Sequence, residues 1–144
     1  AIKERLNITL YGEGPLEEGL KQQARDKWVA SLLSFKGSSS GIPQLLADYE
    51  YLIQPTYMEC FSLSILESLS ANVPVITTTV GGNPEIIKED VNGFLFQPKN
   101  KRALATIIEE VVNGGRKITE DTSALIEKEY SLDRMVAEHI NLLD

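Results

Sequence analysis

Short apolar runs alternate with helical patterns along almost the whole chain, and this alternation limits the possible folds more than any other feature. Runs so short and so apolar are typical of strands that are buried on both faces of a sheet. Strands that alternate with helices pair in parallel through right-handed crossovers. We therefore expect an α/β fold over residues 1–144, a Rossmann-like parallel sheet with helices on both faces. The expected strands are 6–11, 32–36, 51–54, 74–77 and 93–96.

Helical patterns fill the intervals between these strands and the end of the chain. In a parallel sheet, ligands bind beyond the carboxyl ends of the strands, so the loops there are the place to look for a site. The expected helices are 16–28, 42–49, 62–71, 85–88, 101–113, 119–129 and 132–143. Their spacing places these apolar residues of the last three helices in the core: Leu104, Ile107, Ile108, Val111, Leu125, Ile126, Met135 and Ile140.

Charge and composition exclude several classes of function. The formal net charge is −7, which disfavours binding to nucleic acid or to an anionic membrane. No segment approaches the roughly 20 apolar residues of a membrane-spanning helix. The only cysteine, Cys60, cannot form an internal disulfide and suits a reducing compartment. We expect a cytoplasmic protein without a transmembrane segment; a peripheral location at the inner face of a membrane stays open for a longer protein.

The segment from Glu59 to Glu67 carries the strongest functional signal. It lies where the third strand gives way to a helix, and its two carboxylates flank seven residues. The amides at the start of that helix have no intrahelical partner, so with the helix dipole they form a site for a phosphate or diphosphate. A carboxylate on each side of an anion site makes sense if each carboxylate binds the hydroxyls of a sugar. The ligand would then have one sugar on either side of a diphosphate.

This segment resembles the E-x7-E signature of the retaining glycosyltransferases of family 4, which have the GT-B fold. The segments 74–77 and 80–85 resemble the family's P-V-[IV]-[AT]-[ST]-x-x-G-G-x-x-E pattern, and 92–95 resembles its N-G-[FL]-L element. Residues 10–15 resemble a strand that ends in G-x-G-P. Each motif alone is weak, but their shared order and spacing are specific. The likeness extends from about residue 6 to the C-terminus.

The resemblance implies a role for each residue that matches a family motif. Glu67 would bind the ribose hydroxyls of a nucleotide, and Glu59, the candidate catalytic residue, would contact hydroxyls of the transferred sugar. The loop 36–41 would border the base. Further candidates for donor binding lie on the loops and at the start of the helix: Phe61, Ser62, Leu63, Gly12, Gly81 and Gly82.

The chain also departs from the family pattern. Cys60 and Ser62 replace two family glycines, and their side chains could narrow the pocket for the sugar. The family's Arg and Lys that neutralise the diphosphate find no match in Lys3 and Arg5. The acceptor-binding N-terminal domain is also missing. We therefore expect a piece of a longer enzyme that binds donor weakly and transfers little or no sugar by itself.

The resemblance implies a UDP- or GDP-sugar donor, a glycan or lipid-linked acceptor, retention of anomeric configuration, and no metal or other cofactor. The sequence has no Asp-x-Asp motif and no His/Cys cluster with metal-ligand spacing. Polysaccharide biosynthesis is a role suggested by analogy. Two other functions stay open: a nucleotide-sugar epimerase of related fold, and a non-catalytic α/β binding module.

Several residues allow a structural interpretation beside the functional one. The glycines at 12 and 14 lack the third glycine of a dinucleotide fingerprint, so a tight turn is favoured. Gly81 and Gly82 could contact the donor or only let the chain turn. Glu85 could have a role as part of the family motif, or it could only cap the short helix that follows Asn83 and Pro84. Cys60 and His139 are expected to have structural or passive roles.

Overall fold

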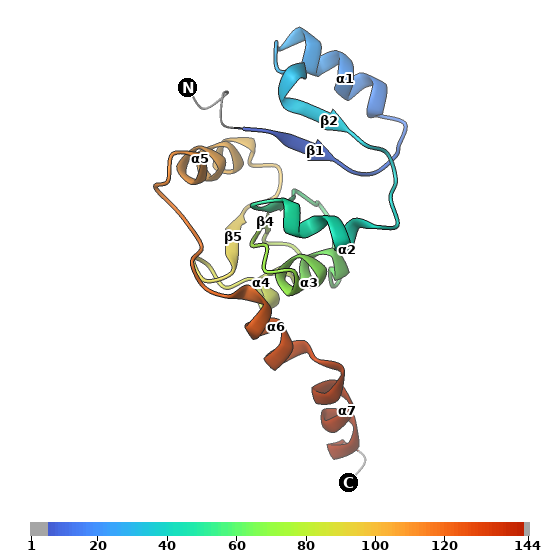
Figure 1. Ribbon diagram of the computed structural model, residues 1–144, viewed down its shortest axis with the longest axis vertical. Helices are drawn as coiled ribbons and strands as arrows, with labels where there is room; N and C mark the ends of the chain where they lie inside the picture. The colour runs from blue at the N-terminus through green and yellow to red at the C-terminus, as the bar shows by residue number, and fades with distance from the viewer. Residues whose placement is uncertain (1–5, 143–144) are drawn as a thin grey trace. The chain divides into compact units, whose positions relative to one another are not determined.

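A computed structural model describes residues 6–142, and its elements follow the alternation that the sequence predicts (Figure 1). The strands are β1 (Ile8–Leu10), β2 (Leu33–Phe35), β3 (Leu52–Gln54), β4 (Val75–Thr78) and β5 (Gly93–Phe96). The α-helices are α1 (Glu17–Asp26), α2 (Ile42–Leu45), α3 (Leu63–Ser70), α4 (Asn83–Ile86), α5 (Lys101–Val112), α6 (Thr122–Tyr130) and α7 (Leu132–Asn141). Two 3₁₀ turns, η2 (Ala30–Leu32) and η3 (Leu46–Asp48), precede β2 and follow α2.

The chain divides into two compact units, Ala1–Ile42 and Pro43–Asp144. Every strand pair in the described residues is parallel, which confirms the predicted α/β class. The strands pair in two sheets, β1–β2 in the first unit and β3–β4–β5 in the second. That all 144 residues act as a single donor-binding domain stays a prediction.

The first unit consists of a two-stranded sheet and its connecting helix. Ile8 pairs with Leu33 and Leu10 with Phe35, and α1 connects the two strands. Beyond the ends of both strands, the N–H of Gly12 donates to the carbonyl of Gly37 at 2.9 Å. The loops that follow β1 and β2 are thereby joined at the carboxyl edge of this sheet.

The second unit has its core on both faces of the central strand β4. All four residues of β4 are buried, and successive side chains point to opposite faces. Val75 belongs to one buried cluster, with residues of α3, α4 and α6, while Ile76 belongs to another, with residues of β5 and α5. Helices therefore cover both faces of this sheet, as the short and nearly all apolar strand runs predict.

The last three helices confirm the predicted core only in part. Ile107 of α5 and Ile126 of α6 are buried, and Leu104, Ile108 and Val111 pack beside Ile107. Leu125 is partly buried.

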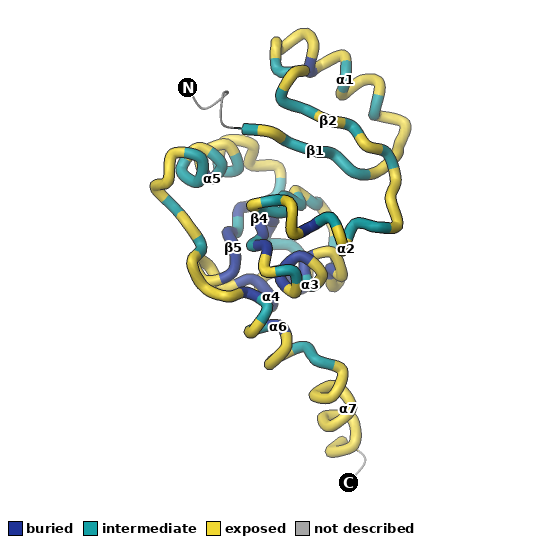
Figure 2. Tube along the Cα trace, in the orientation of Figure 1, coloured by how far each residue is buried: buried dark blue, intermediate teal, exposed yellow. Residues whose placement is uncertain are grey.

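The prediction for α7 is wrong, because Met135 and Ile140 are 51% and 56% exposed. No residue of α7 is buried, and Figure 2 shows this helix exposed along its length. Its periodicity is that of an amphipathic helix, but among the described residues nothing covers its apolar face. No helix within residues 6–142 is both long enough and apolar enough to cross a bilayer.

Candidate functional site

The junction between β3 and α3 is fixed by Ser62. Its hydroxyl caps α3 by accepting from the N–H of Ile65 at 3.4 Å, and it donates to Oε1 of Gln54 at 3.0 Å. Ser62 is 3% exposed, so these two bonds account for its side chain. Because the hydroxyl of Ser62 is used within the protein, the predicted contact of Ser62 with a ligand falls to its backbone amide.

The first turn of α3 lies at the carboxyl end of β3, as predicted. The amides of Leu63 and Ser64, the first two residues of α3, have no carbonyl one turn earlier in the helix to bond. The Leu63 side chain is 70% exposed, so this end of the helix faces solvent. Free amides and the positive end of the helix dipole attract a phosphate or diphosphate.

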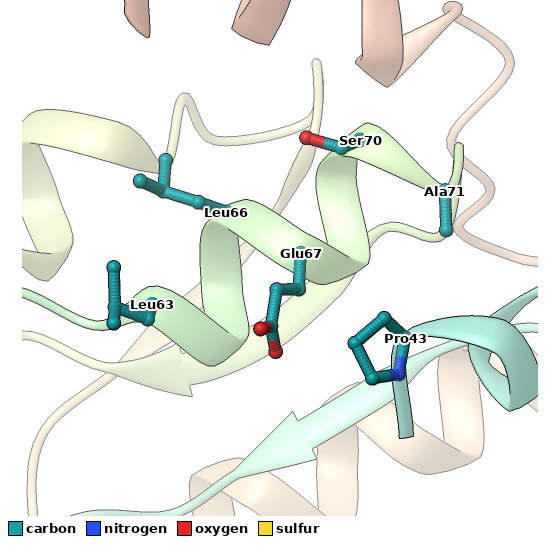
Figure 3. A pocket seen from close by; sticks show the side chains of 6 residues that line it. All are labelled: Pro43, Leu63, Leu66, Glu67, Ser70 and Ala71. Carbon is teal, nitrogen blue, oxygen red and sulfur yellow. The ribbon is translucent and has the colours of Figure 1, made fainter. Parts of the chain in front are cut away.

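Glu67 lies one turn further along α3 and faces an open cavity of about 440 Å³. Figure 3 shows its carboxylate projecting from the helix on the side where Pro43 lies. The other residues that line the cavity come from the same helix and its C-cap: Leu63, Leu66, Ser70 and Ala71. None of the ion pairs within residues 6–142 involves Glu67, so its carboxylate is free to accept bonds from a ligand.

Glu59 lies in the loop before α3 and is partly buried. Its Oε1 accepts from the next residue's amide, that of Cys60, at 3.2 Å. Two residues on, the ring of Phe61 is 44% exposed and lies 6.0 Å from the ring of Tyr130. Glu59 thus precedes the start of α3 on a loop, and Glu67 follows it on the helix.

Gly81 and Gly82 lie against this loop. The N–H of Gly82 donates to the carbonyl of Cys60 at 2.9 Å, and Gly82 is buried. A Cβ at Gly81 would overlap the carbonyl oxygen of Glu59. The structure therefore gives both glycines a packing role, and the predicted contact with donor stays a prediction.

Gly12 borders a separate hollow within the first unit. That cavity, of about 460 Å³, is lined by Tyr11, Gly12, Ser38, Ser39, Ser40 and Ile42. The Glu13 carboxylate accepts from the amide of Ser38 at 3.2 Å and so ties the two loops of this unit together. The loop 36–41, which the resemblance places beside a base, thus contributes to a cavity together with Gly12.

Sequence reasoning missed the residues that hold these loops. Gln54 fixes the cap of α3, and Pro43 lines the cavity beside Glu67, yet neither carries a signal in the sequence. The ring of Tyr130 packs beside that of Phe61. Burial raises the pKa of the Tyr130 phenol. The contact of Tyr130 with Phe61, and the approach of Pro43 to the cavity beside Glu67, join residues far apart in the chain and leave no local pattern.

Acidic, His and Cys side chains do not gather into a metal-binding group in the described part of the chain. Cys60 is exposed and His139 lies on the exposed helix α7. The amides at the start of α3 and the carboxylates of Glu59 and Glu67 are the predicted binding groups, and their role stays a prediction.

Comparison with known proteins gives a consistent result. The sequence model of the family described as "Glycosyl transferases group 1" matches residues 1–131. An uncharacterized glycosyltransferase of Methanocaldococcus jannaschii is 29% identical over 98% of this chain, and a sucrose synthase of Acidithiobacillus caldus is 28% identical over 75% of it. The chain spans 38% of the length of the first relative and 14% of the second.

Solved structures agree on the fold. HepE of Anabaena in complex with UDP has a TM-score of 0.82 at 24% identity, over 94% of this chain and 41% of HepE. HepE in complex with UDP-glucose has a TM-score of 0.78 over the same share of this chain and 40% of HepE. This likeness confirms the predicted fold class.

Proposed function

Because this chain belongs to the group 1 glycosyl transferases, we propose that it binds the nucleotide diphosphate sugar from which the whole protein transfers a glycosyl group. The observation that supports this most is the arrangement around the start of α3. Two amides open the helix, Glu59 precedes them, and Glu67 follows beside a cavity. The diphosphate lies on the amides, the ribose on Glu67 and the transferred sugar on Glu59.

The chemistry of each group supports this division. First-turn amides and the helix dipole stabilise negative charge, and that charge grows on the diphosphate when its bond to the sugar breaks. An ionised carboxylate accepts hydrogen bonds from two neighbouring hydroxyls, as a ribose or a pyranose presents them. The unpaired carboxylate of Glu67, on an open cavity, suits such a ligand.

We infer that UDP-sugars are the first donors to test, since the structural relative HepE was solved with UDP and UDP-glucose. GDP-sugars are the second. The acceptor is a glycan or a lipid-linked saccharide, held by a part of the protein outside this chain. Transfer proceeds with retention of anomeric configuration, as the resemblance to family 4 implies. The enzyme is cytoplasmic, a location that the single cysteine suits.

The same proposal needs no metal ion, because the amides of α3 supply the positive potential that a divalent cation supplies elsewhere. Its test is the transfer rate before and after treatment with EDTA. An unchanged rate supports the proposal. A loss of activity that Mg²⁺ or Mn²⁺ restores contradicts it.

The binding proposal is tested by calorimetric titration of the protein, as its gene encodes it, with UDP, GDP and uridine. We expect UDP or GDP to bind and uridine to bind at least about tenfold more weakly, because it lacks the diphosphate. The variant Glu67→Gln should lower the affinity for the nucleotide by about tenfold or more. Binding of uridine as tight as that of UDP would refute the role of the α3 amides.

A further inference from the structure

The turn at Gly81 and Gly82 lies where a side chain has no room. Gly81 has a φ of +53°, and a Cβ there would overlap the carbonyl oxygen of Glu59. Gly82 has an ordinary φ of −79°, yet its Cβ would lie 2.8 Å from the carbonyl oxygen of Cys60. The backbone of the turn thus lies directly against the backbone of the loop that carries Glu59.

A positive φ could explain a glycine at position 81, but it cannot explain the glycine at position 82. Gly114 has a φ of +75°, and a Cβ built there meets nothing within 4 Å. Gly82 needs no special φ and is still restricted by Cys60. Both glycines lie close to the backbone of residues 59 and 60. At this short distance the N–H of Gly82 donates to the carbonyl of Cys60 at 2.9 Å.

The turn is itself anchored to the end of β4. Asn83 is fully buried, and its Nδ2 donates to Oγ1 of Thr77 and to the carbonyl of Thr78, both at 3.1 Å. The hydroxyls of Thr77 and Thr78 donate in turn to the carbonyls of Gln54 and Thr56, each at 2.8 Å. A chain of hydrogen bonds therefore runs from the buried central strand to the turn and to the loop after β3.

The other contacts of this loop are made on either side of residues 59 and 60: the carbonyl of Thr56 accepts from Thr78, the Lys99 ammonium lies over the ring of Tyr57, and Phe61 lies beside Tyr130. Thr56 Oγ1 donates to the carbonyl of Met58 at 2.9 Å, which is a bond within the loop. Met58 is 87% exposed and Tyr57 is 65% exposed, so neither packs into the core. The glycine turn thus lies directly against the loop backbone at residues 59 and 60.

We propose that the Gly81–Gly82 turn is a positioning element that sets where Glu59 presents its carboxylate to the transferred sugar. The proposal rests on the proposed function, in which Glu59 binds the sugar and Glu67 the nucleotide. A Cβ at Gly81 would overlap the carbonyl oxygen of Glu59, and one at Gly82 would crowd that of Cys60. The backbone of residues 59 and 60 would then have to shift, and the Glu59 carboxylate would shift with it. Glu67 lies on α3, outside this contact, and keeps its place.

The experiment compares the affinities for UDP and for UDP-glucose in the protein as its gene encodes it. Gly82→Ala is the main variant, since it adds no backbone strain, and Gly81→Ala is the more severe one. The control is Gly114→Ala, which also lies at a positive φ, +75° against +53° at Gly81, but has no close neighbour. Thermal unfolding of each variant reports any loss of stability separately from the affinities.

We expect Gly82→Ala to lower the affinity for UDP-glucose about tenfold relative to wild type, while the affinity for UDP changes less than about twofold. The ratio of these two affinities is the quantity to compare among the variants. Gly81→Ala changes the ratio in the same direction, and Gly114→Ala leaves it unchanged. A glycine with a merely structural role would lower the unfolding temperature and leave the ratio of the two affinities as it is; that result overturns the inference. If the wild type binds neither UDP nor GDP, the proposed function itself fails and the inference falls with it.

Discussion

The two carboxylates of the site are held in different ways. Glu67 is part of a regular helix and projects beside an open cavity. Glu59 lies on a loop whose place depends on Gly81 and Gly82, far along the chain. Helix geometry alone places the first residue, whereas packing between distant segments places the second.

This difference has a consequence for the two halves of a donor. The nucleotide side should tolerate changes in the loops around it, because α3 carries its own cap and its own amides. The sugar side should respond to small changes at distant positions.

The largest expected effect separates the two carboxylates by function. Glu59→Gln should lower kcat/KM for transfer by about a hundredfold, because a charged hydrogen bond to the sugar is worth up to about 3 kcal/mol. Its affinity for UDP should change less than about twofold. Steady-state kinetics and calorimetry measure both quantities, with Glu50→Gln, at an exposed position before β3, as the matched control.

The assignment of the two carboxylates to different parts of the donor is wrong if Glu59→Gln lowers the affinity for UDP as much as Glu67→Gln does. The two carboxylates would then act on one part of the donor. An equal loss would also remove the reason for assigning the sugar to the loop.

A smaller effect is expected at Ser62, the residue that joins both regions. Ser62→Ala removes the cap of α3 and the bond to Gln54, and should lower the free energy of unfolding by about 1–2 kcal/mol. Ser64→Ala, at an exposed position in the same turn, should change it by less than about 0.5 kcal/mol. Urea denaturation of both variants checks the difference, and equal losses would contradict the role assigned to Ser62.

The smallest effect concerns acid stability away from both carboxylates. Asp121 caps α6, and bonds from the Ser123 hydroxyl and from the amides of Ala124 and Ser123 hold the pKa of its carboxyl below the usual value. A lowered pKa in the folded state means that the stabilisation is complete above the unfolded-state pKa and is lost as pH falls through the folded one.

Asp121→Asn keeps a capping side chain but cannot titrate. Its stability should therefore fall less than that of wild type between pH 5 and pH 2, as urea unfolding at several pH values will measure. Its affinity for UDP at neutral pH should equal that of wild type. A parallel fall in both proteins would show that the cap does not contribute to the acid response.

Much of the fold could be predicted from local sequence patterns. The bounds of β5 agree with the prediction, since the turn signal Asn-Gly before a short apolar run favours a strand. Helix α6 begins at Thr122 rather than at 119, because the Asp121 side chain caps the helix there. The prediction for Met135 and Ile140 failed because periodicity identifies an apolar face but not what covers it.

The site was predictable where it depends on one element and not where it depends on several. Glu67 and the amides of α3 follow from the position of one helix after one strand. The close approach of Gly81 to Glu59, and the links from Thr77 and Thr78 to the loop after β3, depend on the packing of two strand ends. A Gly-Gly pair in a sequence indicates a turn and does not identify the segment that lies against it.

The most direct test of the central claim is a crystal structure of the protein in complex with UDP. We expect diphosphate oxygens within about 3 Å of the amide nitrogens of Leu63 and Ser64, and ribose hydroxyls at the same distance from the Glu67 carboxylate. A UDP molecule bound elsewhere, or one whose diphosphate lies away from the start of α3, would contradict the account.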